Sequence, residues 1–217
     1  SSSSDSLGMI SALAVTRDGA LVTGSRDSTS LVWDMHDVFF AESSFFGSKK
    51  NSPEDELKPR FRGCGHDAPI TAIAVSEELS VAVSGSEDGT CIVFKLAGAR
   101  FISTLDCGAP IKRVAVTALA FVAAYSEDGQ LHLFRVTGEH LVSLPCPDLE
   151  YIYATADGRC IITSEGNSVC IRSCEEDLKL KEKFGCDSKI LCITVLNGFI
   201  LASAANGKLN VFPISKQ

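Results

Sequence analysis

Cysteine and histidine are the residues of this chain with the widest capacity for chemistry, and the sequence holds nine of the first and four of the second. No two cysteines form a CxxC pair, and no histidine follows at zinc-finger spacing. The closest pair, Cys170 and Cys174, would lie about 13 Å apart on one face of a strand, too far to share a metal or a disulfide. Most of the nine are flanked by Val, Ile and Leu. We therefore predict reduced thiols that pack as small core residues of a cytosolic protein.

Motifs for nucleophilic or acid–base catalysis are missing as well. The four histidines lie in no HExxH motif and near no GxSxG nucleophile elbow; they are His36, His66, His132 and His140. The Ser-Gly-Ser and Asp-Gly elements are expected in hairpins, where glycine supplies a positive φ, and not at strand-to-helix turns that bind phosphate. The sequence therefore predicts a chain that is not an enzyme and has no catalytic residue, cofactor or metal.

Length and charge narrow the class of protein further. The chain has 217 residues, 45% of them hydrophobic, which is enough for a core without disulfides or metals. Its formal net charge of -7 works against a nucleic-acid partner, because such binding needs cations for the phosphates. The most apolar stretch, Val114 to Tyr125, is far shorter than the roughly 20 residues of a membrane span, and Ser1 to Ser6 does not resemble a signal peptide. We expect a soluble chain without direct membrane insertion, with residues 1–6 disordered.

An internal repeat is the dominant signal. An apolar stretch with Ser or Thr leads into a polar turn, and an aromatic residue follows the turn residue by six positions. The turn residues are Asp27, Asp88, Asp128, Gly166 and Asn206, and the residues six positions later are Trp33, Phe94, Phe134, Arg172 and Phe212, so the fourth copy lacks the aromatic. The steps between turns are 61, 40, 38 and 40 residues. A period of about 40 with such a hairpin is typical of the four-stranded blades of a β-propeller.

Alternation and turn residues predict an all-β fold with a defined set of blades. In the second copy the expected strands cover residues 70–75, 81–85, 91–95 and 101–105. We divide residues 7–217 into five blades of a partial propeller: 7–62 with an insertion at 37–62, 63–105, 106–145, 146–185 and 186–217. Since one blade cannot bury its apolar faces alone, the blades must stack around an axis.

Several of these residues resemble the WD40 repeat, whose His, Ser or Thr, Asp and Trp form a hydrogen-bonded tetrad within a blade. The matching elements are Gly65-His66, Ser84, Asp88 and the dipeptide Trp33-Asp34. The resemblance assigns Thr23, Asp27 and Trp33 to the tetrad of the first blade. It assigns His66, Ser84 and Asp88 to that of the second, where Phe94 replaces Trp and has no N–H to donate. The later copies lack the tetrad His and Trp, so their blades are expected to rely on packing and turns.

A closer resemblance is to the C-terminal propeller of BEACH-domain proteins of the neurobeachin and lysosomal-trafficking-regulator group. It rests on Leu21-Val-Thr-Gly-Ser-Arg-Asp-Ser-Thr-Ser-Leu-Val-Trp33, Gly65-His-Asp-Ala-Pro-Ile-Thr71, Ser84-Gly-Ser-Glu-Asp-Gly-Thr-Cys-Ile92 and Leu131-His-Leu-Phe-Arg-Val-Thr-Gly-Glu-His-Leu141. This resemblance implies about seven blades, so about two N-terminal blades and the BEACH domain are expected elsewhere in the parent protein. It also implies a non-catalytic scaffold in vesicle trafficking or lysosome-related organelle biology, in the cytoplasm and peripheral to membranes through other domains.

Two features are candidates for partner binding. Arg26, Glu87 and Glu127 directly precede the turn Asp, with Glu165 at the equivalent place in the fourth copy, and this mainly acidic set is suited to a basic peptide. The insertion contains Val38-Phe39-Phe40 and Phe45-Phe46, which are suited to pack on the propeller or to anchor a partner. It also contains Ser52-Pro53 before an acidic run, a candidate phosphorylation site.

Two other classes of function stay open from the sequence. One is an unrelated WD40 adaptor subunit of a ubiquitin-ligase or ribosome-assembly complex. The other is a propeller enzyme with a site in the central channel, which channel-facing carboxylates or a metal would favour. An upstream BEACH domain in the same gene would favour the scaffold.

Overall fold

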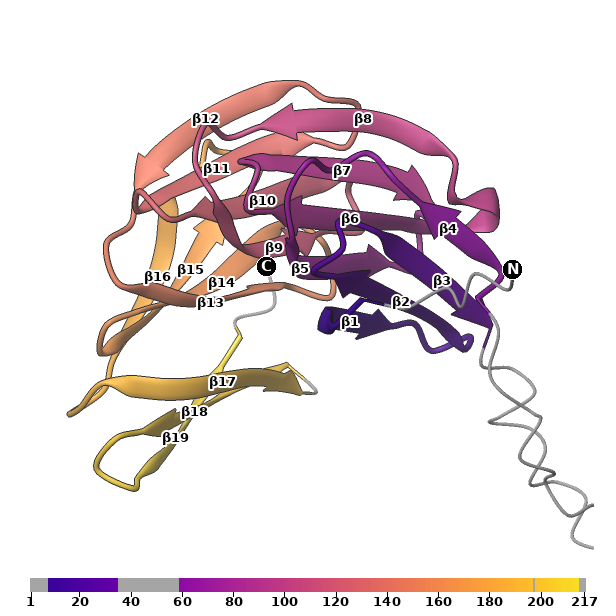
Figure 1. Ribbon diagram of the computed structural model, residues 1–217. Coiled ribbons are helices and arrows are strands. Elements are labelled where there is room, and N and C mark those ends of the chain that lie inside the picture. Colours follow the sequence, from indigo (N-terminus) through magenta and orange to yellow (C-terminus); the bar gives the residue numbers. More distant parts are fainter. Residues whose placement is uncertain (1–7, 35–58, 197, 215–217) are drawn as a thin grey trace, which may run out of the picture.

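The computed structural model describes residues 8–34, 59–196 and 198–214, and within them the chain forms five antiparallel sheets (Figure 1). The first sheet holds β1 (Ile10–Val15), β2 (Ala20–Ser25), β3 (Ser30–Asp34) and β4 (Phe61–Gly63). The second holds β5 (Ile70–Ser76), β6 (Val81–Ser86), β7 (Thr90–Lys95) and β8 (Phe101–Asp106), with the 3-10 turn η2 (Ala97–Ala99) before β8. The third holds β9 (Ile111–Val116), β10 (Phe121–Ser126), β11 (Gln130–Arg135) and β12 (His140–Pro145). The fourth holds β13 (Leu149–Ala154), β14 (Cys160–Glu165), β15 (Ser168–Ser173) and β16 (Leu180–Gly185), and the fifth holds β17 (Ile190–Leu196), β18 (Phe199–Ala204) and β19 (Leu209–Pro213).

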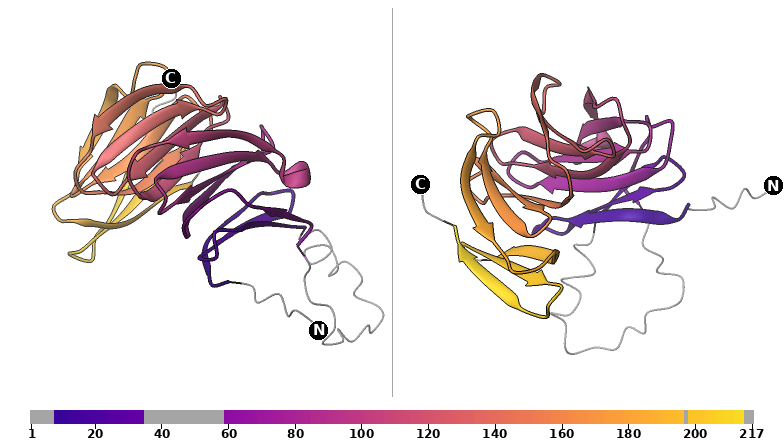
Figure 2. Two further views of the ribbon diagram at one scale, coloured as in Figure 1. Left: turned by 45° about the horizontal axis from the view of Figure 1, so that its top comes forward. Right: turned by 90° about the vertical axis from the view of Figure 1, so that its left-hand side faces the viewer.

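The sheets follow one another along an open arc and do not close into a ring (Figure 2). This is the predicted all-β propeller architecture, with five blades. The four strands expected in the second blade are present, each one residue longer than predicted. In the described residues no helix has the length and apolarity to cross a bilayer.

Burial explains why each strand has its composition. The second strands β6 and β10 are buried along their whole length, since neighbouring sheets cover both faces, and they are accordingly rich in Val, Ala and Ser. The outer strands β8 and β12 instead alternate between covered and exposed residues. Apolar side chains from adjacent sheets interlock; Val83 and Val93 of the second sheet lie in one cluster with Ile111 and Val122 of the third.

The innermost strands of neighbouring sheets are joined by a repeated side-chain clamp. Near the start of each inner strand, one side chain donates a hydrogen bond to a backbone carbonyl of the next inner strand. Ser11 donates to the Ile70 carbonyl, Thr71 Oγ1 to Ile111 (2.5 Å), Arg113 Nε to Glu150 (2.9 Å) and Tyr151 Oη to Leu191 (2.7 Å). Each of the four junctions between sheets therefore has one clamp, although the residue type changes from hydroxyl to guanidinium to phenol.

Two predictions about local structure need correction. The Asp-Gly glycines do have the expected positive φ, as at Gly89 (85°) and Gly129 (82°). The glycine of the Ser-Gly-Ser element, Gly85, instead lies inside a strand, where space and not φ requires glycine, and Gly24 of the first blade lies in a strand in the same way. The predicted insertion, 37–62, also extends too far. Its last two residues, 61–62, belong to β4, which completes the first sheet by pairing with β3.

The two ends of the arc leave apolar side chains uncovered. On the first sheet, Leu13 and Val15 are 66% and 54% exposed, and on the last sheet, Leu209 and Val211 are 64% and 53% exposed. The fifth sheet has three strands in the described residues, so β19 has no partner along its outer edge. Faces of this kind are suited to further blades, in line with the expectation that this chain is part of a larger ring.

Candidate functional site

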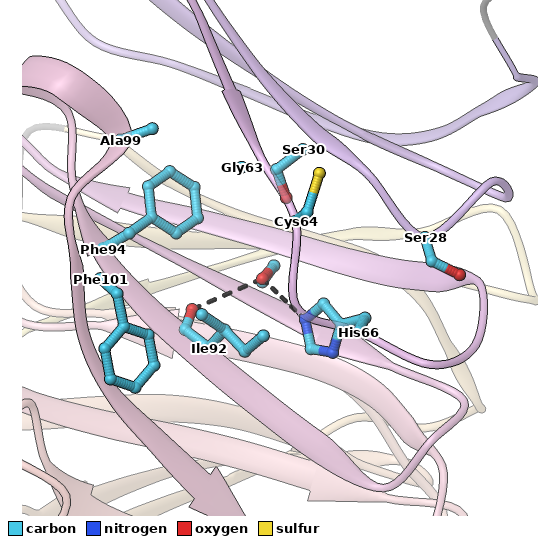
Figure 3. A pocket seen from close by; sticks show the side chains of 10 residues that line it. Ser28, Ser30, Gly63, Cys64, His66, Ile92, Phe94, Ala99 and Phe101 are labelled. Atoms are coloured by element: carbon cyan, nitrogen blue, oxygen red, sulfur yellow. Dashed lines mark hydrogen bonds between the residues drawn. The ribbon is translucent and has the colours of Figure 1, made fainter.

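A histidine network joins two strands of the second blade, the hairpin between them and the loop before the blade. The His66 Nδ1–H donates to Asp88 Oδ2 (2.9 Å), and His66 Nε2 accepts from the Ser84 hydroxyl (2.8 Å; Figure 3). Thr90 donates to Asp88 Oδ1 through its backbone amide (2.8 Å) and its hydroxyl (2.7 Å). Burial alone would raise the pKa of Asp88, but the hydrogen bonds from Thr90, the Asp67 amide and His66 outweigh it and lower that pKa. The three residues predicted for this blade are thus brought together.

Ser84, His66 and Asp88 are hydrogen-bonded in the same order as a catalytic Ser-His-Asp triad. Catalysis would require a substrate to reach the Ser84 hydroxyl. Ser84 is only 1% exposed, and His66 is 8% exposed. The cavity that reaches them, between the first two sheets, has a volume of about 30 Å³, room for little more than water. Among the described residues, a cavity of this volume has no room for a substrate carbonyl beside the Ser84 hydroxyl, and the bonds of this network hold strands and the turn in position.

The first blade uses its predicted residues in two separate groups. The Trp33 indole Nε1–H donates to Thr23 Oγ1 (2.9 Å) across β2 and β3. Asp27 accepts from the amide (3.0 Å) and hydroxyl (2.6 Å) of Thr29 and from the Gly8 amide (3.2 Å). These bonds, led by the Thr29 hydroxyl, lower the pKa of the Asp27 carboxyl. Without a histidine to bridge them, the Trp33–Thr23 pair and the Asp27 turn remain distinct.

The third blade contains a network that the sequence analysis missed. The His140 Nε2–H donates to Ser143 Oγ (2.8 Å), and the Ser143 hydroxyl donates to His132 Nδ1 (2.8 Å). The His132 Nε2–H in turn donates to Ser126 Oγ (3.0 Å), whose hydroxyl donates to Asp128 Oδ1 (2.5 Å). The third blade was expected to rely on packing and turns rather than on the tetrad, and this polar network is an addition that the expectation did not include. The available signal was a lone histidine between Leu131 and Leu133, whose strand partner in the register is Ser143.

The fourth blade replaces histidine chemistry with an ion pair and corrects the placement of Glu165. The Arg172 guanidinium donates to Glu165 Oε1 through Nη2 (2.9 Å) and Nε (3.1 Å), and Thr163 donates to the same oxygen (2.8 Å). The two charged side chains are 12% and 18% exposed. The hairpin between β14 and β15 has two residues where those of the second and third blades have three, so Glu165 ends a strand and points inward. It cannot join the proposed partner-binding face.

The other three residues of that face lie as the sequence predicted, in exposed turns between the second and third strands of their blades. Arg26, Glu87 and Glu127 are all solvent exposed. Glu127 lies 3.7 Å from the Lys112 ammonium, a surface pair that leaves both groups open to water. Ser52 and the paired phenylalanines of the insertion lie outside the described residues.

Comparison with known proteins decides the family. A family model described as the neurobeachin beta propeller domain matches residues 2–217. The chain belongs to the neurobeachin propeller family. Its likeness to BEACH proteins is therefore not generic blade chemistry, and the alternative of an unrelated WD40 adaptor is not supported.

Two relatives of this neurobeachin-type propeller cover nearly all of it. BEACH domain-containing protein B of Arabidopsis thaliana is 29% identical over 95% of this chain and 8% of its own length. A Caenorhabditis elegans protein described as a neurobeachin homologue is 25% identical over 92% of this chain and 6% of its own length. The chain thus spans less than a tenth of these relatives.

A solved structure shows the same fold. The computationally designed protein Ika8 superposes with a TM-score of 0.70 at 18% sequence identity, covering 94% of this chain and 58% of the designed one. At this identity the likeness shows the fold alone.

The thiols of the neurobeachin-type propeller pack in its core. Seven of the nine cysteines are buried, all nine are free, and Cys64 and Cys192 are exposed. Burial raises the pKa of Cys146 and Cys170 to about 11 and that of Cys174 to about 12, which disfavours the reactive thiolate. Among the described residues, no group of three or more His, Cys, Asp or Glu is arranged to hold a metal ion.

The His132 network predicts that the propeller loses stability in mildly acidic solution. Burial lowers the pKa of His132, the Asp128 charge opposes this and His140 reinforces it. The unfolded chain, in which histidine titrates near pH 6.5, then binds a proton that the folded chain does not, so stability falls as pH drops below about 6.5. Hydrogen bonds, led by that from Ser126, lower the pKa of Asp128, so its own contribution is lost only at more acidic pH.

Urea unfolding at pH 7.5 and pH 5.5 measures this effect. We expect the free energy of unfolding to fall by up to about 1.4 kcal/mol between these values, and the fall to shrink in His132→Gln. A variant with an undiminished pH dependence would show that another group titrates.

Proposed function

We propose that this neurobeachin-type propeller is a non-catalytic module for protein–protein interaction within a BEACH-type protein. The observation that carries the proposal is that the polar side chains best suited to catalysis form hydrogen bonds that stabilise the interior of their own blades. His66, His132 and Glu165 each bond to neighbouring strands or turns of their own blade. The exposed turns of the blades are then available to meet another molecule.

The inner face of the arc gives no support to the alternative of a propeller enzyme. The hollow between β1, β5, β9 and β13 is lined mainly by apolar residues, with no carboxylate among them in the part of the chain that is described. A channel site for hydrolysis or proton transfer would need such groups or a metal.

Charge on the exposed turns favours a partner with basic residues. Glu87 makes no ion pair within the described residues, and the pairing of Glu127 with Lys112 is long and solvated. Together with the net charge of -7, these carboxylates would accelerate encounter with a Lys- or Arg-bearing peptide and disfavour acidic surfaces. Arg26, on the first blade, would mark the edge of this acidic region.

Membership of the family supports a proposal for the cellular role. We place the parent protein in vesicle trafficking or lysosome-related organelle biology, in the cytoplasm, with membrane association supplied by other domains. The support is the BEACH-type character of the relatives and the small part of their length that this propeller spans. An acidic module has no electrostatic attraction to anionic lipid.

Charge reversal tests the acidic turns. Binding of a fluorescein-labelled peptide of Lys-Gly repeats, followed by anisotropy at low ionic strength, is expected to weaken at least about tenfold in the double variant Glu87→Lys/Glu127→Lys, because steering and local attraction are both reversed.

The matched control is Glu139→Lys/Glu175→Lys, which makes the same change of net charge in exposed turns at the opposite ends of the strands. We expect the control to change the affinity less than about twofold. Equal losses in both variants would mean that only net charge matters, and the assignment of the face would be wrong.

A further inference from the structure

The inner face of the arc holds a second feature, separate from the acidic turns. Strands β1, β5, β9 and β13 surround a hollow of about 600 Å³, a size typical of ligand pockets. Its wall is mainly Val, Ile, Leu and Ala, and its only side chains with polar atoms are those of Arg113, Tyr151 and Tyr153.

Arg113 is held in place before any ligand arrives. Its Nε–H donates to the Glu150 carbonyl (2.9 Å), and its Nη1 donates to the Lys112 carbonyl (2.8 Å). The guanidinium carbon lies 5.9 Å from the centre of the Tyr151 ring, whose hydroxyl is tied to the Leu191 carbonyl. These contacts fix the fork of the guanidinium, while Nη2 makes no hydrogen bond within the described residues.

Arg113 differs from its cationic neighbours, each of which has a carboxylate within 4 Å. Lys189 lies 3.1 Å from Glu150, and Lys112 makes a long, solvated pair with Glu127 at 3.7 Å. Across the described part of the chain, no carboxylate comes within 4 Å of Arg113. A fixed guanidinium with a free N–H edge beside an apolar wall is a site for an anionic oxygen.

Tyr153 adds a second donor to the same hollow. Its hydroxyl makes no hydrogen bond with any described residue, and burial raises its pKa, an effect that the nearby Arg113 charge partly opposes. The phenol therefore stays protonated near neutral pH, and Tyr153 is a second residue with a hydrogen-bond donor in the lining of the hollow.

We propose that this hollow binds the C-terminal carboxylate of a partner peptide that ends in an apolar residue. A C-terminal residue carries its carboxylate and its side chain on one carbon, so it can meet the two donors and the apolar wall at once. An internal Asp or Glu meets the donors but needs a second residue for the wall. The free Nη2 of Arg113 and the second N–H of Nη1 suit a planar carboxylate, which can accept two parallel hydrogen bonds.

The test uses fluorescein-labelled peptides of Gly and Ser that end in Leu, Phe or Val, with either a free carboxylate or an amide at the C-terminus. At least one free-acid peptide is expected to bind, and its amide at least about tenfold more weakly, because the charge-assisted bonds are lost. An amidated peptide with an internal Glu before Leu distinguishes the side-chain source and is expected to bind no better than the other amides.

Two variants locate the site. Arg113→Gln is expected to weaken the free-acid peptide at least about tenfold. Because it also removes the clamp to Glu150, Tyr153→Phe serves as the second variant: it keeps the ring and its packing, loses one hydroxyl, and is expected to weaken binding at least about threefold. The control is Arg135→Gln, an arginine outside the hollow that packs on Phe121, and it is expected to bind as the parent does.

Four results would overturn the proposal: no binding of any free-acid peptide, equal binding of acid and amide, tighter binding of the internal Glu peptide, or unchanged affinity in Tyr153→Phe with a parent-like melting temperature. None of these outcomes bears on Glu87 and Glu127, so this site and the acidic turns stand or fall separately.

Discussion

Gly85→Ala is expected to cost the propeller about 2 kcal/mol of unfolding free energy, although alanine is the smallest possible addition. A Cβ at position 85 would lie 2.5 Å from Ile111 Cγ2 and 3.0 Å from Val114 Cγ1, both on the inner strand of the next blade. These side chains are buried in the junction and cannot move away without opening it. Urea unfolding of the chain, with the midpoint and slope both measured, reads the loss.

Gly185→Ala is the matched control for this substitution. Gly185 is the last residue of β16 and, like Gly85, has an ordinary φ, but nothing lies within 4 Å of its added Cβ. There we expect no loss and a gain of up to about 1 kcal/mol, since alanine restricts the unfolded chain. In a double-mutant cycle, Ile111→Ala should reduce the cost of Gly85→Ala. Equal effects at the two glycines would refute the steric explanation.

The glycine case shows which part of the fold local sequence can predict. The five copies and the hairpin glycines could be predicted from the sequence because the conformation of a turn depends on neighbouring residues, as at Gly89 and Gly129. The need for glycine at positions 24 and 85 arises from the next blade, 46 and 26 residues further along the chain, at Ile70 and Ile111. Contacts of that range depend on how blades stack, which a single repeat does not reveal.

The residues of the candidate site also divide into those that local sequence predicts and those that depend on distant contacts. The His66 network matched a motif, so its residues were named in advance, whereas the relay through His132 uses Ser143 from a strand that no motif includes. The placement of Glu165 failed because one residue fewer in a hairpin turns a side chain from solvent to the interior. Arg113 gave no sequence signal, because its proposed role depends on which nearby charged side chains have an ion-pair partner in the folded chain.

The Glu165–Arg172 pair leads to the second large expected effect. Arg172 stands at the aromatic position of the repeat, so Arg172→Phe restores the side chain that the second and third blades have there. We nevertheless expect this variant to lose about 3 kcal/mol in urea unfolding, because it leaves the Glu165 carboxylate enclosed without its cation. The Thr163 hydroxyl alone cannot compensate a charge at 18% exposure.

Glu165→Ser/Arg172→Phe separates the two explanations for such a loss. Serine is the residue that ends the second strand in the second and third blades, at Ser86 and Ser126, so the double variant carries their residue types at both positions. If the cost comes from an unpaired charge, the double variant should return to within about 1 kcal/mol of the parent, since replacing both partners of an enclosed pair is often nearly neutral. If the phenylalanine does not fit, the loss persists in the double variant. Recovery would mean that the ion pair stabilises the fourth blade as the histidine networks stabilise the second and third blades, and that it can be replaced by the residues of those blades.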